Sequence, residues 1–103
     1  MTERYEIAWN SKSGKDLATI KAYLIDNTSE YTALKVIKGL IQIVHTLEEQ
    51  PERYPIYLPL RKYGNYRYIV KWNFRIVYEF TGHQVIVNRI IHTKRAYKVR
   101  KDG

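Results

Sequence analysis

The chain has 103 residues, lacks cysteine and carries a formal net charge of +8 at pH 7. Its length fits one domain, and its 45% hydrophobic content suffices for one packed core. The lack of cysteine excludes a disulfide framework and a cysteine-based zinc site. With no signal-like N-terminus and no long apolar run, we expect a soluble, cytoplasmic protein.

The charge is unevenly distributed along the chain. Residues 1–50 hold six basic and seven acidic residues, a net charge of −1, whereas residues 51–103 hold twelve basic and three acidic residues, a net charge of +9. Most of the ten tyrosines also lie in the second half. A basic half that is rich in aromatic residues favours a polyanionic partner such as RNA or DNA, or an acidic protein, over charge that serves solubility alone.

The first third of the chain predicts a strand followed by a helix. Residues 4–9 alternate weakly between apolar and polar side chains, which indicates a strand. The helix after it should be capped by Ser11 or Ser13 and should end near Asp26.

A second helix is predicted from about Glu30 to Glu48, capped by Thr28 or Ser29. Its apolar residues recur at helical spacing and form one wide face, made of Ala33, Leu34, Ile37, Leu40, Ile41, Val44 and Leu47. Two amphipathic helices joined by so short a turn form an αα-hairpin. Pro51 and Pro55 then end the helical region.

Residues 66–92 predict three short strands joined by the turns Trp72-Asn73 and Gly82-His83. The element order is therefore β-α-α-β-β-β. This order is typical of an α+β domain with an N-terminal helical hairpin packed on one face of a small antiparallel sheet. The other face of the sheet is left open.

The turn at Gly82-His83 sets the register of the last two strands. The expected pairs are Phe80 with Val85, Tyr78 with Val87, and Arg75 with Ile90. One face then reads as core, with Arg89 as the exception: Phe74, Ile76, Tyr78, Phe80, Val85, Val87 and Ile91. The other face carries Arg75 and His92 within diagonal reach of each other. A slip of one residue would put Arg75 and His92 on opposite faces.

Three stretches follow one another in the second half of the chain: LEEQPERYP after the second helix, FRIVYEF at residues 74–80 and VIVNRIIHTKR at residues 85–95. With the element order, they resemble the RelE/ParE superfamily of bacterial type II toxins, which includes plasmid stabilisation proteins. The resemblance implies a single toxin domain over residues 1–103, with a basic tail from about residue 93. It also implies neutralisation by an antitoxin encoded beside the toxin.

The superfamily has two branches with different targets. RelE-like members cut mRNA in the ribosomal A site, whereas ParE-like members poison DNA gyrase and have no recognised nuclease site. The sequence motifs lead us to the hypothesis of a metal-independent, ribosome-dependent endoribonuclease, an mRNA interferase. The alternatives are a gyrase poison and an inactive homologue that only binds its antitoxin, because the fold is common to both branches.

Four residues resemble the catalytic groups of the RelE-like branch. Arg75 resembles its strand arginine and Arg95 its C-terminal arginine, and each would hold the scissile phosphate through a guanidinium. His92 would act as general acid or base, because histidine titrates near neutral pH. Tyr97 resembles a tail aromatic residue that stacks on a base or assists proton transfer. Glu79 is a further candidate base, or the partner of Arg75 in an ion pair.

Four cationic residues are candidates for RNA binding. Arg67 and Lys71 occupy the positions where RelE-like enzymes carry a pair of lysines, although that pair is not reproduced here. Lys94 and Lys98 belong to the basic tail, in which five of the eight residues 94–101 are cationic. The sequence predicts no metal site and no organic cofactor, because it has no glycine-rich phosphate loop and no carboxylate cluster.

The expected partner is an acidic, partly disordered antitoxin. An open sheet face, free sheet edges and a charge of +9 in one half of the chain invite an acidic segment that adds a helix or a strand. We expect the antitoxin to cover Arg75 or to displace the tail. The second expected partner is mRNA on the ribosome, or DNA gyrase under the alternative.

Overall fold

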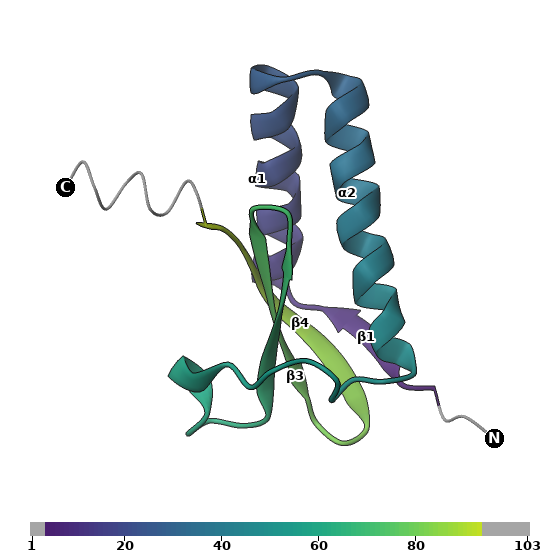
Figure 1. The fold of residues 1–103 in the computed structure, drawn as a ribbon, viewed down its shortest axis with the longest axis vertical. Coiled ribbons are helices and arrows are strands. Elements are labelled where there is room, and N and C mark those ends of the chain that lie inside the picture. Colours follow the sequence, from purple (N-terminus) through teal and green to yellow (C-terminus); the bar gives the residue numbers. More distant parts are fainter. Residues whose placement is uncertain (1–3, 94–103) are drawn as a thin grey trace.

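A computed structural model describes residues 4–93. These residues form two helices and four strands (Figure 1): β1 (Glu6–Trp9), α1 (Ser11–Asn27), α2 (Glu30–His45), β2 (Tyr66–Lys71), β3 (Phe74–Phe80) and β4 (Gln84–His92). Short 3₁₀ turns occupy Thr46–Glu48 and Leu58–Leu60. The predicted β-α-α-β-β-β order and the α+β class are confirmed.

The four strands form one sheet in the order β1-β4-β3-β2. The two hairpins, β2–β3 and β3–β4, are antiparallel, but β1 pairs with β4 in parallel. The sheet is therefore mixed, where an antiparallel sheet was predicted. Tight turns dictate the direction of the last three strands, whereas the long helical connection after β1 allows β1 to run parallel to its neighbour.

Each helix begins at a polar cap. Asn10 caps α1, where Ser11 or Ser13 was expected: its side-chain oxygen accepts a hydrogen bond from the backbone N–H of Ser13 at 2.8 Å. Ser13 is instead buried, and its hydroxyl donates to the backbone oxygen of Asn10 at 3.1 Å. Ser29, one of the two predicted residues, caps α2 through the N–H of Thr32. Satisfying these free N–H groups stabilises both helix starts.

The two helices run side by side and pack on one face of the sheet (Figure 1). The core cluster joins both helices to the central strands: Ile20, Leu40, Val44, Leu47, Ile69, Phe74, Ile76, Tyr78, Phe80, Val85, Val87 and Ile90. The predicted contact between the helical hairpin and the Phe74, Ile76 and Tyr78 face is confirmed. Leu34 was expected on the apolar face of α2, but it is 50% exposed.

A β-bulge changes the register between β3 and β4. The predicted pairs Phe80 with Val85 and Tyr78 with Val87 are confirmed. Beyond them Val77 lies opposite Arg89, so Asn88 is an extra residue in β4. Arg75 therefore lies opposite Ile91, and its predicted pairing with Ile90 is wrong.

The bulge also corrects which residues of β4 belong to the core. Ile90 becomes a core residue with 3% exposure, and Ile91, expected in the core, lies across from Arg75 on the other face. Arg89, the exception on the predicted core face, is exposed. The extra residue thus keeps a charged side chain out of the interior.

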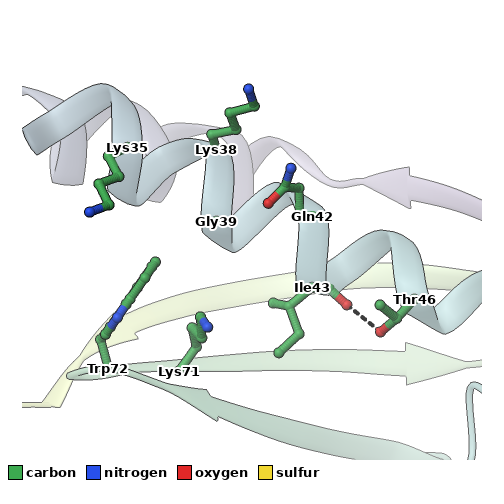
Figure 2. Close-up of a pocket in the computed structure, with 8 residues that line it drawn as sticks. All are labelled: Lys35, Lys38, Gly39, Gln42, Ile43, Thr46, Lys71 and Trp72. Atoms are coloured by element: carbon green, nitrogen blue, oxygen red, sulfur yellow. Dashed lines mark hydrogen bonds between the residues drawn. The ribbon is translucent and has the colours of Figure 1, made fainter. Parts of the chain in front are cut away.

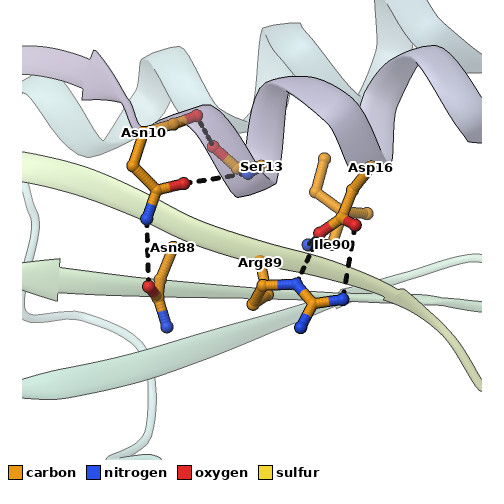
Figure 3. A network of polar contacts seen from close by, with 6 residues as sticks. All are labelled: Asn10, Ser13, Asp16, Asn88, Arg89 and Ile90. Atoms are coloured by element: carbon orange, nitrogen blue, oxygen red, sulfur yellow. Dashed lines mark hydrogen bonds and ion pairs between the residues drawn. The ribbon is translucent and has the colours of Figure 1, made fainter.

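Helix α1 is fastened to β4 just past the bulge (Figure 3). The Asp16 carboxylate accepts hydrogen bonds from Arg89 Nε at 2.8 Å, from Arg89 Nη2 at 3.3 Å and from the backbone N–H of Ile90 at 2.9 Å. This carboxylate raises the pKa of Arg89, chiefly through the hydrogen bond. The network satisfies a strand N–H that has no strand partner, because β1 ends opposite Val87.

A buried hydroxyl ties the segment after α2 to the sheet. The Tyr78 hydroxyl donates a hydrogen bond to the backbone oxygen of Pro51. Burial raises the pKa of Tyr78 above its ordinary value.

Within residues 4–93, no helix has both the length and the apolar character needed to cross a membrane.

We predict that Asp16→Asn lowers the free energy of unfolding by about 1 to 3 kcal/mol, because it weakens charge-assisted hydrogen bonds to Arg89 and Ile90. Urea denaturation would measure the change. Asp26→Asn, an exposed change on the same helix, is the matched control. Equal effects of the two changes would contradict the proposed fastening of α1 to β4.

We predict that Tyr78→Phe lowers the free energy of unfolding by about 1 to 3 kcal/mol at neutral pH, because the Pro51 oxygen loses its donor. A second effect appears in alkali. Above a pH of about 10 the unfolded tyrosine ionises while the folded one keeps its proton, so stability falls as pH rises. Tyr78→Phe should make this loss shallower. Urea titrations from neutral to alkaline pH would measure both effects, and the exposed Tyr63→Phe is the control.

Candidate functional site

The sheet face that points away from the helices carries several of the predicted site residues. We call it the open face, and its members follow from the strand register: Tyr66, Tyr68, Val70, Arg75, Val77, Glu79, Ile86, Arg89 and Ile91. Val77 is buried among them, whereas Val70 is 58% exposed. The open face is therefore an apolar and aromatic surface with one glutamate and two arginines, of which Arg89 is paired with Asp16.

Arg75 lies over the ring of Tyr68, which in turn contacts Tyr57. Its guanidinium carbon is 5.4 Å from the centroid of the Tyr68 ring, and the Tyr68 ring meets Tyr57 edge-on at 5.9 Å. Such a cation–π contact holds an arginine in place while leaving its charge available. Within residues 4–93, Arg75 forms no ion pair, and its buried Nε atom makes no hydrogen bond. We call Arg75, Tyr68 and Tyr57 the Arg75 cluster.

Glu79 is engaged with a tyrosine rather than with Arg75. It lies opposite Tyr66 in the register of β2 and β3. Burial raises the pKa of Tyr66, and the charge of Glu79 and a hydrogen bond to it add to the increase. This contact gives Glu79 a structural partner, and the predicted ion pair with Arg75 is not among those of residues 4–93.

His92 lies on the helix-covered face, so its predicted place beside Arg75 is wrong. Its ring stacks on Phe74, its partner across the strands, with centroids 4.8 Å apart. The His92 ring also contacts the ring of Tyr23 in α1, with the two centroids 5.6 Å apart. The bulge at Asn88 is the cause, because the extra residue exchanges the faces of all later side chains in β4.

Arg67 is largely occupied by contacts within the chain. Its guanidinium donates to the backbone oxygens of Glu52 and Tyr54 and to the side-chain oxygen of Asn65. It also pairs with the Glu52 carboxylate at 3.6 Å, and its side chain is 16% exposed. These contacts hold the segment after α2 against β2.

Lys71 lies at the end of β2 opposite to Arg67, and its side chain points toward the helices. Its partner across the strands is the core residue Phe74, and its ammonium lies 4.6 Å from the centroid of the Trp72 ring. The remaining predicted residues, Lys94, Arg95, Tyr97 and Lys98, lie outside the described residues. Of the other predicted site residues that lie within residues 4–93, the structure brings none to Arg75.

Sequence reasoning missed two features of the surface. It did not single out Tyr68 and Tyr57 as the support of Arg75, although Tyr68 and Arg75 lie on the same face of two adjacent strands. It also missed Trp72, together with Lys35 and Lys38 on the facing helix. A bulky residue in a two-residue turn was the available signal, because such turns favour glycine or asparagine.

The described residues contain no group of three histidine, cysteine, aspartate or glutamate side chains placed to hold a metal ion. On the open face, the Arg75 guanidinium and the Tyr68 ring are groups that can bind a partner. A guanidinium on an aromatic support suits a carboxylate or phosphate of a partner.

Comparisons with known proteins give the chain a family. A family model described as the ParE toxin of the type II toxin-antitoxin system parDE matches residues 7–97. A search of curated protein sequences gave no match. A solved chain titled "Chromosomal ParDE TA system from P. aeruginosa" is 19% identical, with a TM-score of 0.72, and the match covers 86% of this chain and 96% of that one. Because the family model spans most of the sequence, the chain belongs to the ParE toxin family of type II toxin-antitoxin systems.

Proposed function

We propose that this toxin poisons DNA gyrase and does not cleave RNA. The family model supports this choice over the RelE-like hypothesis, because ParE-like members of the superfamily act on gyrase. The observation that carries the proposal is the separation of Arg75 from His92 by the thickness of the sheet.

Metal-free RNA cleavage needs several groups around one phosphate. A base must take the 2′-OH proton, a cation must stabilise the phosphate, and an acid must protonate the leaving oxygen. Arg75 lies on the open face, whereas His92 is packed between aromatic rings on the other face. Glu79 is engaged with Tyr66. A centre built on Arg75 would therefore lack the predicted histidine.

The Arg75 cluster is better suited to a protein interface. Arginine and tyrosine are the side chains that most often dominate binding energy, and they do so when packed at the centre of a contact. Here the Tyr68 ring, which packs against Tyr57, restrains Arg75 before any partner arrives. A restrained side chain loses less entropy on binding. We propose that this cluster contacts an acidic or polar surface of gyrase.

The partner that neutralises the toxin is, on this proposal, an acidic antitoxin encoded beside it. The solved chain with the same fold is titled as part of a ParDE system. An acidic segment that lies on the open face would pair with Arg75 and exclude gyrase. Inhibition of the toxin then follows from competition for one surface.

We predict that the purified toxin makes gyrase accumulate cleaved DNA, and that Arg75→Ala weakens this effect by about 30-fold or more, the loss typical of a dominant interface residue. A cleavage assay with purified gyrase and plasmid would measure it. Arg61→Ala, an exposed arginine outside the cluster, is the matched control. Circular dichroism would show that both variants fold.

A brief induction of the toxin without antitoxin tests the same proposal in cells. Intact mRNA, an SOS response and gyrase-linked DNA breaks are the expected results. Rapid cutting of mRNA inside codons with intact DNA would contradict the gyrase proposal and return the protein to the endoribonuclease hypothesis.

We predict that His92→Phe retains growth inhibition within about two-fold, because phenylalanine preserves the stacking with Phe74 and Tyr23. Growth curves after induction would measure it. The same change should abolish activity if His92 transfers a proton. Because His92→Phe keeps the packing and removes the titratable group, loss of toxicity in a folded variant would count against the structural role.

A further inference from the structure

A groove lies between α2 and the β2–β3 turn, on the helix side of the sheet (Figure 2). It encloses about 570 Å³ and is lined by Lys35, Lys38, Gly39, Gln42, Ile43, Thr46, Lys71 and Trp72. We call it the Trp72 groove. Figure 2 shows Lys71 and Lys35 extending into the space between strand and helix, and Lys38 extending along the outer side of the helix.

Trp72 has a backbone conformation that its side chain does not favour. Its φ of 54° is positive, which glycine or asparagine would adopt at lower cost in a two-residue turn. Half of the side chain is exposed, so burial repays only part of that cost. Strained residues of this kind cluster at functional positions.

Gly39 of α2 makes room for the indole. A Cβ atom at position 39 would lie 2.4 Å from Cη2 of Trp72, so any other residue would displace the ring. The ring therefore stands against the bare backbone of the helix, with the Lys71 ammonium 4.6 Å from its centroid. Helix and turn together hold the aromatic ring in a fixed place at the groove.

The lining of the groove favours a polyanion. Three of its residues are lysines, and none is acidic. The apolar lining is limited to Ile43 and Trp72 beside the glycine. An amphipathic helix needs a longer row of apolar contacts at helical spacing, so the groove suits an acidic peptide less well.

We propose that the Trp72 groove binds single-stranded nucleic acid. One base stacks on the half-exposed indole, and the three lysines neutralise phosphates on either side of it. This combination of a stacking ring and cations along a groove is how proteins hold single strands without reading sequence.

The proposed site is distinct from the Arg75 cluster. Lys71 and Val70 are neighbours on β2 and point to opposite faces, so the groove lies on the helix side and Arg75 on the open face. The proposal goes beyond action on gyrase and does not depend on it. Binding to a free strand can be measured without gyrase.

A fluorescence titration tests the proposal directly. The chain has two tryptophans, so a Trp9→Phe background leaves Trp72 as the only one. We expect a single-stranded oligothymidylate to quench Trp72 fluorescence as it binds. Trp72→Gly, which suits the positive φ and keeps the turn, should weaken binding of a fluorescein-labelled strand by about 10-fold or more.

The contribution of the lysines is measured by salt dependence. The triple change Lys35→Gln, Lys38→Gln and Lys71→Gln should reduce the slope of log affinity against log salt by about 2, from about 0.7 for each phosphate contact on a single strand. The matched control removes three exposed lysines outside the groove, Lys12, Lys21 and Lys62. It should lower the slope clearly less.

The proposal would be overturned by no quenching at low salt, by equal slopes for the two triple variants, or by binding that is unchanged in a folded Trp72→Gly protein. Polyglutamate serves as the probe for an acidic peptide. If it quenches Trp72 and displaces the labelled strand at equal charge concentration, the groove is a peptide site. Gyrase poisoning by the groove variants, measured separately, shows whether the groove also contributes to the action on gyrase.

Discussion

The extra residue in β4 is the constraint on which the rest of the molecule depends. Up to Val87 the strand alternates between core and open face, and a regular continuation would place Arg89 in the interior. Burying an unpaired arginine there would cost several kcal/mol. Asn88 absorbs the conflict as a bulge, so Ile90 fills the core and Arg89 turns outward.

The bulge then determines how the helices attach. β1 ends opposite Val87, and the edge of β4 beyond that point has no strand partner. Asn10 closes the gap by bonding to the Val87 oxygen through its backbone N–H and to Asn88 through its side chain. Asp16, one turn into α1, accepts hydrogen bonds from the N–H of Ile90, which has no strand partner, and from the side chain of Arg89 (Figure 3). The start of α1 thus replaces the missing strand.

The sequence was enough to predict the elements, their order, both hairpin turns and the helix-covered face. Periodicity and turn residues are local signals, and the tertiary structure agrees with them here. The parallel direction of β1 was missed because a long connection leaves strand direction open. The bulge was missed although Arg89 signalled it. A lone arginine among alternating strand positions that are otherwise apolar indicates a change of register.

Missing the bulge at Asn88 led to the wrong placement of His92 in the predicted site. Arg75 was placed correctly on the open face, since its parity within β3 does not depend on the pairing. His92 follows the bulge, so its face could not be derived from the turn at Gly82-His83 alone. Arg67 was misjudged for another reason. Its position on β2 was clear, but its hydrogen bonds to Glu52 and Tyr54 come from a loop whose path no periodic pattern describes.

The strand β2 connects the two surfaces that the proposals concern. Its alternation sends Tyr68 and Val70 to the open face and Lys71 to the helix side. A partner that is itself a protein bound to DNA offers two chemistries at once, a polar protein surface and exposed phosphates. The Arg75 cluster suits the first, and the Trp72 groove suits the second. Both surfaces belong to the short β2–β3 hairpin. A target that contacts both of them would therefore have the β2–β3 turn between its protein surface and its DNA.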